Sequence, residues 1–151
     1  MGCDIHCFLL KEEENGTLKE YALYNKIEKG ADIFFEKAYV AEERSYPLFS
    51  KLADVRGYEK EIDCGTYGFI PGCPEYIIDI YNNDYYHTPK YFNYKELMKC
   101  AKIEGMTEFL DDYGAENYNI VEEWLNEFNI IRYSYGLYDK DNLYIQIFFD
   151  N

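Results

Sequence analysis

The chain has 151 residues, 48% of them hydrophobic, which favours one domain spanning residues 1–151 with its own core. Its 15 basic and 29 acidic residues give a formal net charge of −14, which excludes direct binding of nucleic acids or anionic membranes as an expected function. No apolar run approaches the roughly 18 residues that a membrane-spanning helix needs.

Five cysteines, an odd number without a Cys-x-x-Cys pair, follow no signal peptide. This pattern favours a reduced protein in the cytoplasm. The chain also lacks the P-loop and dinucleotide-binding patterns, and we expect no cofactor.

Residues 4–13 and 18–24 are predicted to form an N-terminal β-hairpin, because the intervening Glu-Asn-Gly-Thr is a typical turn sequence. Strand alternation places Asp4 and His6 on one face, roughly 7 Å apart at their Cα atoms. The opposite, apolar face is expected to enter the core and comprises Ile5, Cys7 and Leu9.

Residues 25–44 show an irregular, charged pattern and are expected to form loop and short strand. Ser45, with Pro47 in the first turn, then predicts the start of a short helix that stops at Gly57.

Three glycines and two prolines between residues 63 and 74 predict an ordered loop. A short helix is expected over 75–83 and an extended segment over 84–92. A further helix is expected from 93 to 103, opened by an Asn-x-x-Glu capping pattern.

Residues 116–128 have the clearest helical period, with an apolar face opposite an acidic one. Residues 130–151 alternate on both sides of Asp-Lys-Asp-Asn, which predicts a C-terminal hairpin. The economical assembly is an α+β fold, in which an antiparallel sheet with N- and C-terminal hairpins is packed by three to four helices.

The chain contains only two histidines, so few side chains could act as general acid or base near neutral pH. Asp4, His6 and His87 together would form a two-histidine, one-carboxylate metal site. No metal-type spacing supports that site. The alternative is that His6 is hydrogen-bonded beneath a loop while Asp4 caps a backbone turn.

The glycine-rich loop suggests a second kind of site, for an anion. Its backbone N–H groups would act together with Arg56, one of three arginines in the chain. The alternative for Arg56 is to cap the preceding helix and pair with a carboxylate. The 18 tyrosines favour a binding face, although an AT-rich genome would produce the same composition.

Several short motifs occur in order along the chain: MGCDIH, YPLFSKLADVR, GFIP, YYHTPKYFNYKEL and a final IFFDN. Together they resemble a family of small phage and prophage proteins of unknown function, over nearly the whole length. One departure is Tyr86, which precedes His87 in a segment where the family commonly shows two histidines. The predicted ligand-binding residues are Asp4, His6, Arg56, Tyr86, His87 and Asp150.

The resemblance implies a phage accessory protein in the host cytoplasm that evades host defence. We expect it to bind and sequester a small anionic, nucleotide-like ligand, with rings stacked on a base and Arg56 at the phosphate. Two alternatives are a metal-assisted hydrolase and an acidic inhibitor of a nucleic-acid-binding host protein. A non-catalytic binder is favoured over an enzyme, and a homo-oligomer is compatible with the sequence.

Overall fold

The computed structural model describes residues 2–103 and 119–150. Within these ranges the chain forms an α+β domain with antiparallel sheets, which confirms the predicted fold class. A helix was expected over 116–128. Residues 116–118 lie outside the described ranges, and the observed helix spans Ile120–Ser134.

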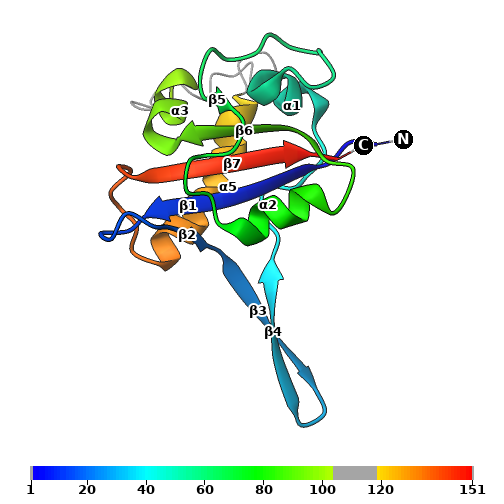
Figure 1. The fold of residues 1–151 in the computed structure, drawn as a ribbon, viewed down its shortest axis with the longest axis vertical. Helices are drawn as coiled ribbons and strands as arrows, with labels where there is room; N and C mark the ends of the chain where they lie inside the picture. The colour runs from blue at the N-terminus through cyan, green and yellow to red at the C-terminus, as the bar shows by residue number, and fades with distance from the viewer. Residues whose placement is uncertain (1, 104–118, 151) are drawn as a thin grey trace, which may run out of the picture.

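The main sheet has five antiparallel strands in the order β2-β1-β7-β6-β5 (Figure 1). β1 (Ile5–Glu12) and β2 (Leu18–Tyr21) form the predicted N-terminal hairpin. β7 (Leu143–Phe149) lies between β1 and β6 (His87–Asn93), and β5 (Thr66–Tyr67) forms the far edge. Strands from both ends of the chain are therefore neighbours at the centre of the sheet.

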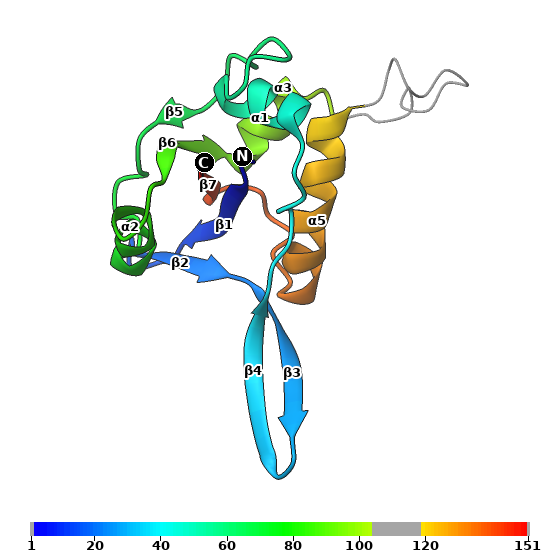
Figure 2. The same ribbon diagram turned by 90° about the vertical axis from the view of Figure 1, so that its right-hand side faces the viewer.

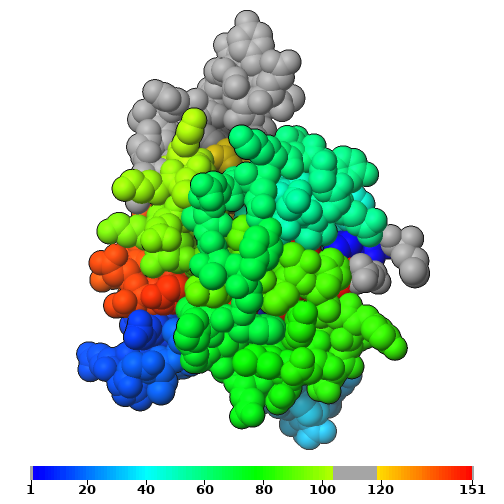
Figure 3. Space-filling view, turned by 45° about the horizontal axis from the view of Figure 1, so that its top comes forward, coloured from blue at the N-terminus to red at the C-terminus, as the bar shows by residue number. Residues whose placement is uncertain are grey.

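Helices cover both faces of this sheet (Figure 2). α1 (Tyr46–Ala53), α3 (Tyr94–Cys100) and α5 (Ile120–Ser134) pack on one face. α2 (Glu75–Asn82) packs on the other, where the segment from β5 through α2 lies across the sheet (Figure 3). None of the helices in the described ranges is long and apolar enough to cross a membrane.

Strand alternation in β1 produces two separate cores. The predicted inward residues, including Ile5 and Leu9, lie in the larger core beneath α1, α3 and α5. Phe8 and Leu10 point to the opposite face and pack with Phe148 in a smaller core beneath α2. Because both faces are covered, β1 is apolar and buried on both sides from Cys7 to Leu10, whereas His6 before this run and Lys11 and Glu12 after it are partly or fully exposed.

Ser45 caps α1 as predicted, with its hydroxyl accepting a hydrogen bond from the Leu48 N–H (3.4 Å). The helix ends earlier than predicted, at Ala53. Asp54 follows in the left-handed conformation (φ 54°), and its N–H donates to the carbonyls of Phe49 and Ser50 in the helix.

The predicted C-terminal hairpin is wrong. Residues 130–134 belong to α5, and β7 pairs with β1 and β6. The helix ends just before Gly136, which adopts a left-handed conformation (φ 69°), and the Leu137 N–H donates to the Arg132 carbonyl (2.8 Å). The buried Arg132 guanidinium also donates to the carbonyls of Leu137 (3.1 Å) and Tyr138 (3.1 Å), which holds the residues after α5 against the helix.

Residues 25–44, expected to be loop and short strand, contain most of a second hairpin. β3 (Leu23–Lys29) and β4 (Asp32–Ala38) pair along their whole length and project away from the main sheet (Figures 1 and 2). We call residues 23–38 the arm. Both of its faces carry exposed side chains, so the sequence lacks the alternation that marks a half-buried strand.

Candidate functional site

The ends of β1 and β7 bring three of the predicted residues together. The Asp4 N–H donates to Asp150 Oδ1 (3.0 Å), and the Asp150 N–H donates to the Asp4 carbonyl (3.0 Å). His6 Nε2 is hydrogen-bonded to Asp150 Oδ2 (3.0 Å). The side chains of His6 and Asp150 are 26% and 32% exposed, so this cluster reaches the surface.

The Asp150 carboxyl is held in its ionised form. Burial would raise its pKa, but the hydrogen bonds from His6 and from the Asp4 N–H lower the pKa below its ordinary value of 3.8. Arg44 adds to this effect from a greater distance.

Arg44, which the sequence did not indicate, neutralises Asp4. Its Nε and Nη2 atoms both lie 2.8 Å from Asp4 Oδ1. The guanidinium occupies the space that a side chain at Gly2 would need, because a Cβ there would lie 2.0 Å from Arg44 Nη1. The Asp4 side chain is therefore an ion-pair partner of Arg44.

Tyr86 lies against His6, with the two rings edge to face at 4.8 Å. Phe148 stacks on His6 from another side at 5.5 Å. Burial, with smaller effects from Asp84 and Asp150, raises the pKa of Tyr86, so its hydroxyl stays protonated. His6 is thus fixed by two rings and one carboxylate.

Arg56 lies beside α1. Its guanidinium carbon lies 5.0 Å from the centre of the Tyr46 ring, and Tyr46 stacks with Tyr58 at 6.0 Å. Burial raises the pKa of Cys3, and the Arg56 charge opposes this rise, so the guanidinium is near that thiol.

His87 points to the opposite face of the sheet from His6. His87 stacks on Phe149 and His6 stacks on Phe148, and adjacent residues of β7 face opposite ways. Thr88, which is hydrogen-bonded to His87 Nδ1 (2.8 Å), has a φ of 54°, a strained value for a β-branched residue, beside a register shift in β6.

The metal site that the sequence offered as an alternative is therefore not assembled. His6 and His87 lie on different faces, and no group of three His, Cys, Asp or Glu side chains in the described ranges could hold a metal ion. His87 Nε2 is buried without a hydrogen-bond partner in this part of the chain.

A groove of about 520 Å³ opens beside His6. β1 forms its floor, α2 one wall and the base of the arm the other. Four tyrosines contribute to its surface, so the groove is aromatic. The lining residues are His6, Cys7, Phe8, Glu20, Tyr24, Lys37, Tyr39, Glu42, Tyr76, Ile80 and Tyr86.

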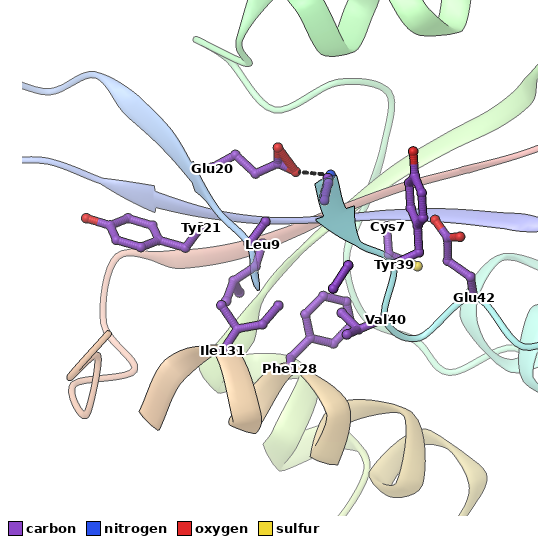
Figure 4. Close-up of a pocket in the computed structure, with 12 residues that line it drawn as sticks. Cys7, Leu9, Glu20, Tyr21, Tyr39, Val40, Glu42, Phe128 and Ile131 are labelled. Atoms are coloured by element: carbon purple, nitrogen blue, oxygen red, sulfur yellow. Dashed lines mark hydrogen bonds and ion pairs between the residues drawn. The ribbon is translucent and has the colours of Figure 1, made fainter. Parts of the chain in front are cut away.

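Glu20 braces the two walls of this groove. Its carboxylate accepts hydrogen bonds from Lys37 Nζ (2.6 Å) and from the Tyr76 hydroxyl (2.8 Å). Figure 4 shows the first of these as a dashed line at Glu20. Lys37 also lies 4.7 Å above the Phe8 ring. The Lys37 charge is thus already balanced within the wall.

The segment that follows the arm places Glu42 at the groove. Ala41 adopts a left-handed conformation (φ 58°), and its carbonyl accepts hydrogen bonds from Trp124 Nε1 (3.2 Å) and Cys7 Sγ (3.6 Å). In Figure 4, Tyr39 and Glu42 project away from α5. The anchored carbonyl therefore fixes the direction of the Glu42 side chain.

Glu42 is half-buried, and burial raises the pKa of its carboxyl, with His6 and Lys37 opposing the rise. No hydrogen bond or ion pair in the described ranges involves this carboxylate. A desolvated carboxylate in a tyrosine-lined groove is suited to receive a positively charged group.

Sequence reasoning missed Glu20, Lys37, Tyr39, Glu42 and Arg44, all of which come from the second strand of the hairpin or from residues 25–44. The only signal was the run from Tyr39 to Arg44 directly before the Ser45 cap, where the chain must cross from a strand to a helix.

Comparison with models of protein families, with curated proteins and with solved structures finds no match to this chain.

Proposed function

We propose that the protein is a non-catalytic binding protein whose groove captures a lysine or arginine side chain of a basic partner protein. The Glu42 carboxylate carries this proposal, because it is half-buried, lacks a hydrogen-bond partner in the described ranges and faces a tyrosine-lined hollow. A guanidinium or ammonium entering the groove would pair with Glu42 and lie against the rings.

The cations near the groove support a basic partner over an anionic one. Lys37 is paired with Glu20, Arg44 with Asp4, and His6 with Asp150. A phosphate would have to break one of these pairs and also approach Glu42. A positively charged side chain meets neither obstacle.

The charge of the whole molecule supports the same class of partner. A net charge of −14 attracts basic proteins and accelerates their encounter at low ionic strength. Proteins that bind nucleic acids present such basic surfaces. In the setting that the resemblance to phage proteins implies, the partner is a nucleic-acid-binding host protein in the host cytoplasm.

The test is an NMR titration of the isotope-labelled protein with a Gly-Arg-Gly peptide. Amide shifts are expected around His6, Tyr39 and Glu42. The same peptide with citrulline, which is uncharged, should bind at least about tenfold more weakly. Absence of shifts at about 10 mM peptide, a concentration that detects very weak binding, would contradict the proposal.

Glu43 provides a matched control, because it is the exposed neighbour of Glu42 and lines a different hollow. E42Q and E43Q change the net charge equally. We expect E42Q to weaken peptide binding about tenfold and E43Q to leave it nearly unchanged. Equal weakening by both variants would reduce the interaction to general electrostatic attraction.

A second candidate, binding of a nucleotide-like anion, is favoured by the position of Arg56. Its guanidinium lies over the Tyr46 ring, which stacks with Tyr58, and these rings could also hold a base. Calorimetry with mononucleotides and cyclic nucleotides tests this candidate, with R56Q as the variant expected to lose the heat of binding. No binding below about 1 mM would set it aside.

A further inference from the structure

The arm exposes large apolar side chains that the body of the protein leaves uncovered. Phe35 is 70% exposed, Ile33 is 55% exposed and Phe34 is 51% exposed. On one face of the arm Phe34 stands opposite Ile27, which is only partly buried. Apolar residues grouped in this way mark an interaction surface.

The arm is also an incomplete sheet. It consists of two strands, and in the described ranges neither of its outer edges pairs with another strand. Isolated two-stranded hairpins are marginally stable in water, and a third strand stabilises them. The row of unpaired N–H and C=O groups along β3 is a template for such a strand.

The charges of the arm differ from those of the rest of the chain. Its three lysines balance Glu28, Asp32 and Glu36, so residues 23–38 are neutral in a protein of net charge −14. A basic partner would be drawn to the acidic body and not to this arm. Two arms can meet while the acidic bodies stay apart, because the arm projects beyond the body (Figures 1 and 2).

We propose that the occupant of the β3 edge is a second copy of this chain, whose β3 strand pairs antiparallel about Ile27. This register places Ile27 opposite Ile27 of the second copy. Lys26 then lies opposite Glu28 of the second copy, and Glu28 opposite Lys26. The symmetry of the pairing repeats this favourable charge pair on both sides of the axis.

The same register extends the apolar row across both arms. Phe34 neighbours Ile27 within each arm, so the dimer lines up Phe34 and Ile27 of one copy with Ile27 and Phe34 of the other. The product is a four-stranded sheet in the order β4-β3-β3-β4. This dimer goes beyond the proposed capture of a basic side chain and does not depend on it.

Other symmetric registers are less favourable. Pairing of β3 about Lys26 or about Glu28 places that charge opposite its own copy. Pairing of β4 about Phe34 places Asp32 opposite Glu36. Among these registers, only the one about Ile27 places Lys26 of each copy opposite Glu28 of the other.

Sedimentation equilibrium of the full chain tests the proposal with K26E and E28K, both at exposed positions of the arm. Each variant brings like charges together in the dimer, and each should raise the dissociation constant at least about tenfold. If only general repulsion between the acidic bodies mattered, E28K would strengthen the dimer, because it reduces the net negative charge.

An equimolar mixture of the two variants restores opposite charges at both pairs. In a heterodimer the glutamate introduced by K26E faces the lysine introduced by E28K, and the unchanged Glu28 of the first variant faces the unchanged Lys26 of the second. We expect the mixture to form heterodimers with about the wild-type dissociation constant. The proposal is overturned if the wild type remains monomeric at about 1 mM, if either variant dimerises as well as the wild type, or if the mixture does not restore association.

Discussion

Glu42 and Asp150 show how two carboxylates in one neighbourhood acquire opposite properties. Asp150 receives hydrogen bonds from His6 and from the Asp4 N–H, which hold its pKa low against the effect of burial. Glu42 is desolvated and has no such bonds in the described ranges, so its pKa is raised. The ionised form of Asp150 therefore stabilises the folded protein, whereas the ionised form of Glu42 destabilises it.

Replacement of Asp150 by Asn should flatten the acid side of the stability profile. The folded-state pKa of Asp150 lies below its ordinary value of 3.8, so its contribution is present above that pH and is lost as pH falls below it. The free energy of unfolding of the wild type should therefore fall more steeply than that of D150N between about pH 4.5 and 2.5. Urea unfolding across this range measures both slopes, and parallel curves would contradict the assignment.

E42Q should leave stability at pH 7 no lower than that of the wild type. The folded-state pKa of Glu42 is raised, so the ionised carboxyl opposes folding above that pKa, and Gln removes this opposition. The free energy of unfolding should lie within about 0.5 kcal/mol of the wild-type value or above it. A loss of more than about 1 kcal/mol would mean that Glu42 supports the fold instead of a ligand.

At the scale of elements, Lys90 of β6 ties the sheet to α1 and to the loop that follows it. Its buried ammonium donates to the Leu52 carbonyl (2.7 Å) and to Glu61 Oε1 (2.7 Å). The ammonium also lies 4.8 Å from the centre of the Tyr67 ring. Three groups between residues 52 and 67 thus converge on one positive charge supplied by β6.

Removal of Glu61 should destabilise the protein more than removal of Lys90. E61A leaves a buried ammonium without its counter-charge, which costs about 2 kcal/mol or more. K90M keeps the aliphatic stem against the rings and leaves Glu61 free to be hydrated, so it should cost less. In chemical unfolding, the E61A/K90M double variant should be more stable than E61A alone. A double variant less stable than E61A would refute this view of the pair.

Elements whose ends carry local signals could be predicted from the sequence. Ser45 and Asn93 cap α1 and α3 as expected, because a cap depends on neighbouring residues alone. The strand expected after residue 130 was wrong, although Gly136, which follows α5 in a left-handed conformation (φ 69°), is a local signal for the end of a helix. The arm escaped prediction because neither of its faces is buried.

The candidate site was predicted only in part, for a related reason. Asp4 and His6 meet Asp150 because their strands are neighbours, a pairing that follows from register and not from sequence spacing. Glu42 depends on the bonds of the Ala41 carbonyl to α5 and β1, which join distant segments. Such contacts become visible only when the whole sheet is assembled.

At the scale of the whole molecule, the dominant property is the excess of negative charge. A compact body of net charge −14 repels itself, and this repulsion opposes folding more strongly when salt is scarce. The internal ion pairs at Asp4, Glu20 and Asp150 reduce this repulsion only locally.

Salt should therefore raise the thermal stability near neutral pH. Between about 10 mM and 150 mM sodium chloride the Debye length falls from roughly 30 Å to 8 Å, and relief of about 1 kcal/mol would raise Tm by about 2–4 °C. Scanning calorimetry measures this shift. Near pH 4.5, the isoelectric point, the same salt should change Tm little, and a similar rise there would point to a different cause.

The hydrogen bonds between Asp4 and Asp150 place the two ends of the described chain side by side. A short flexible linker could join them without crossing the sheet, and the exposed turn at Gly30 offers a place to open the backbone. Such a circular permutant would retain β1 and β7 as central neighbours while releasing the arm into two loose tails. The permutant would thus show whether the rest of the protein folds when the arm cannot form its two-stranded sheet.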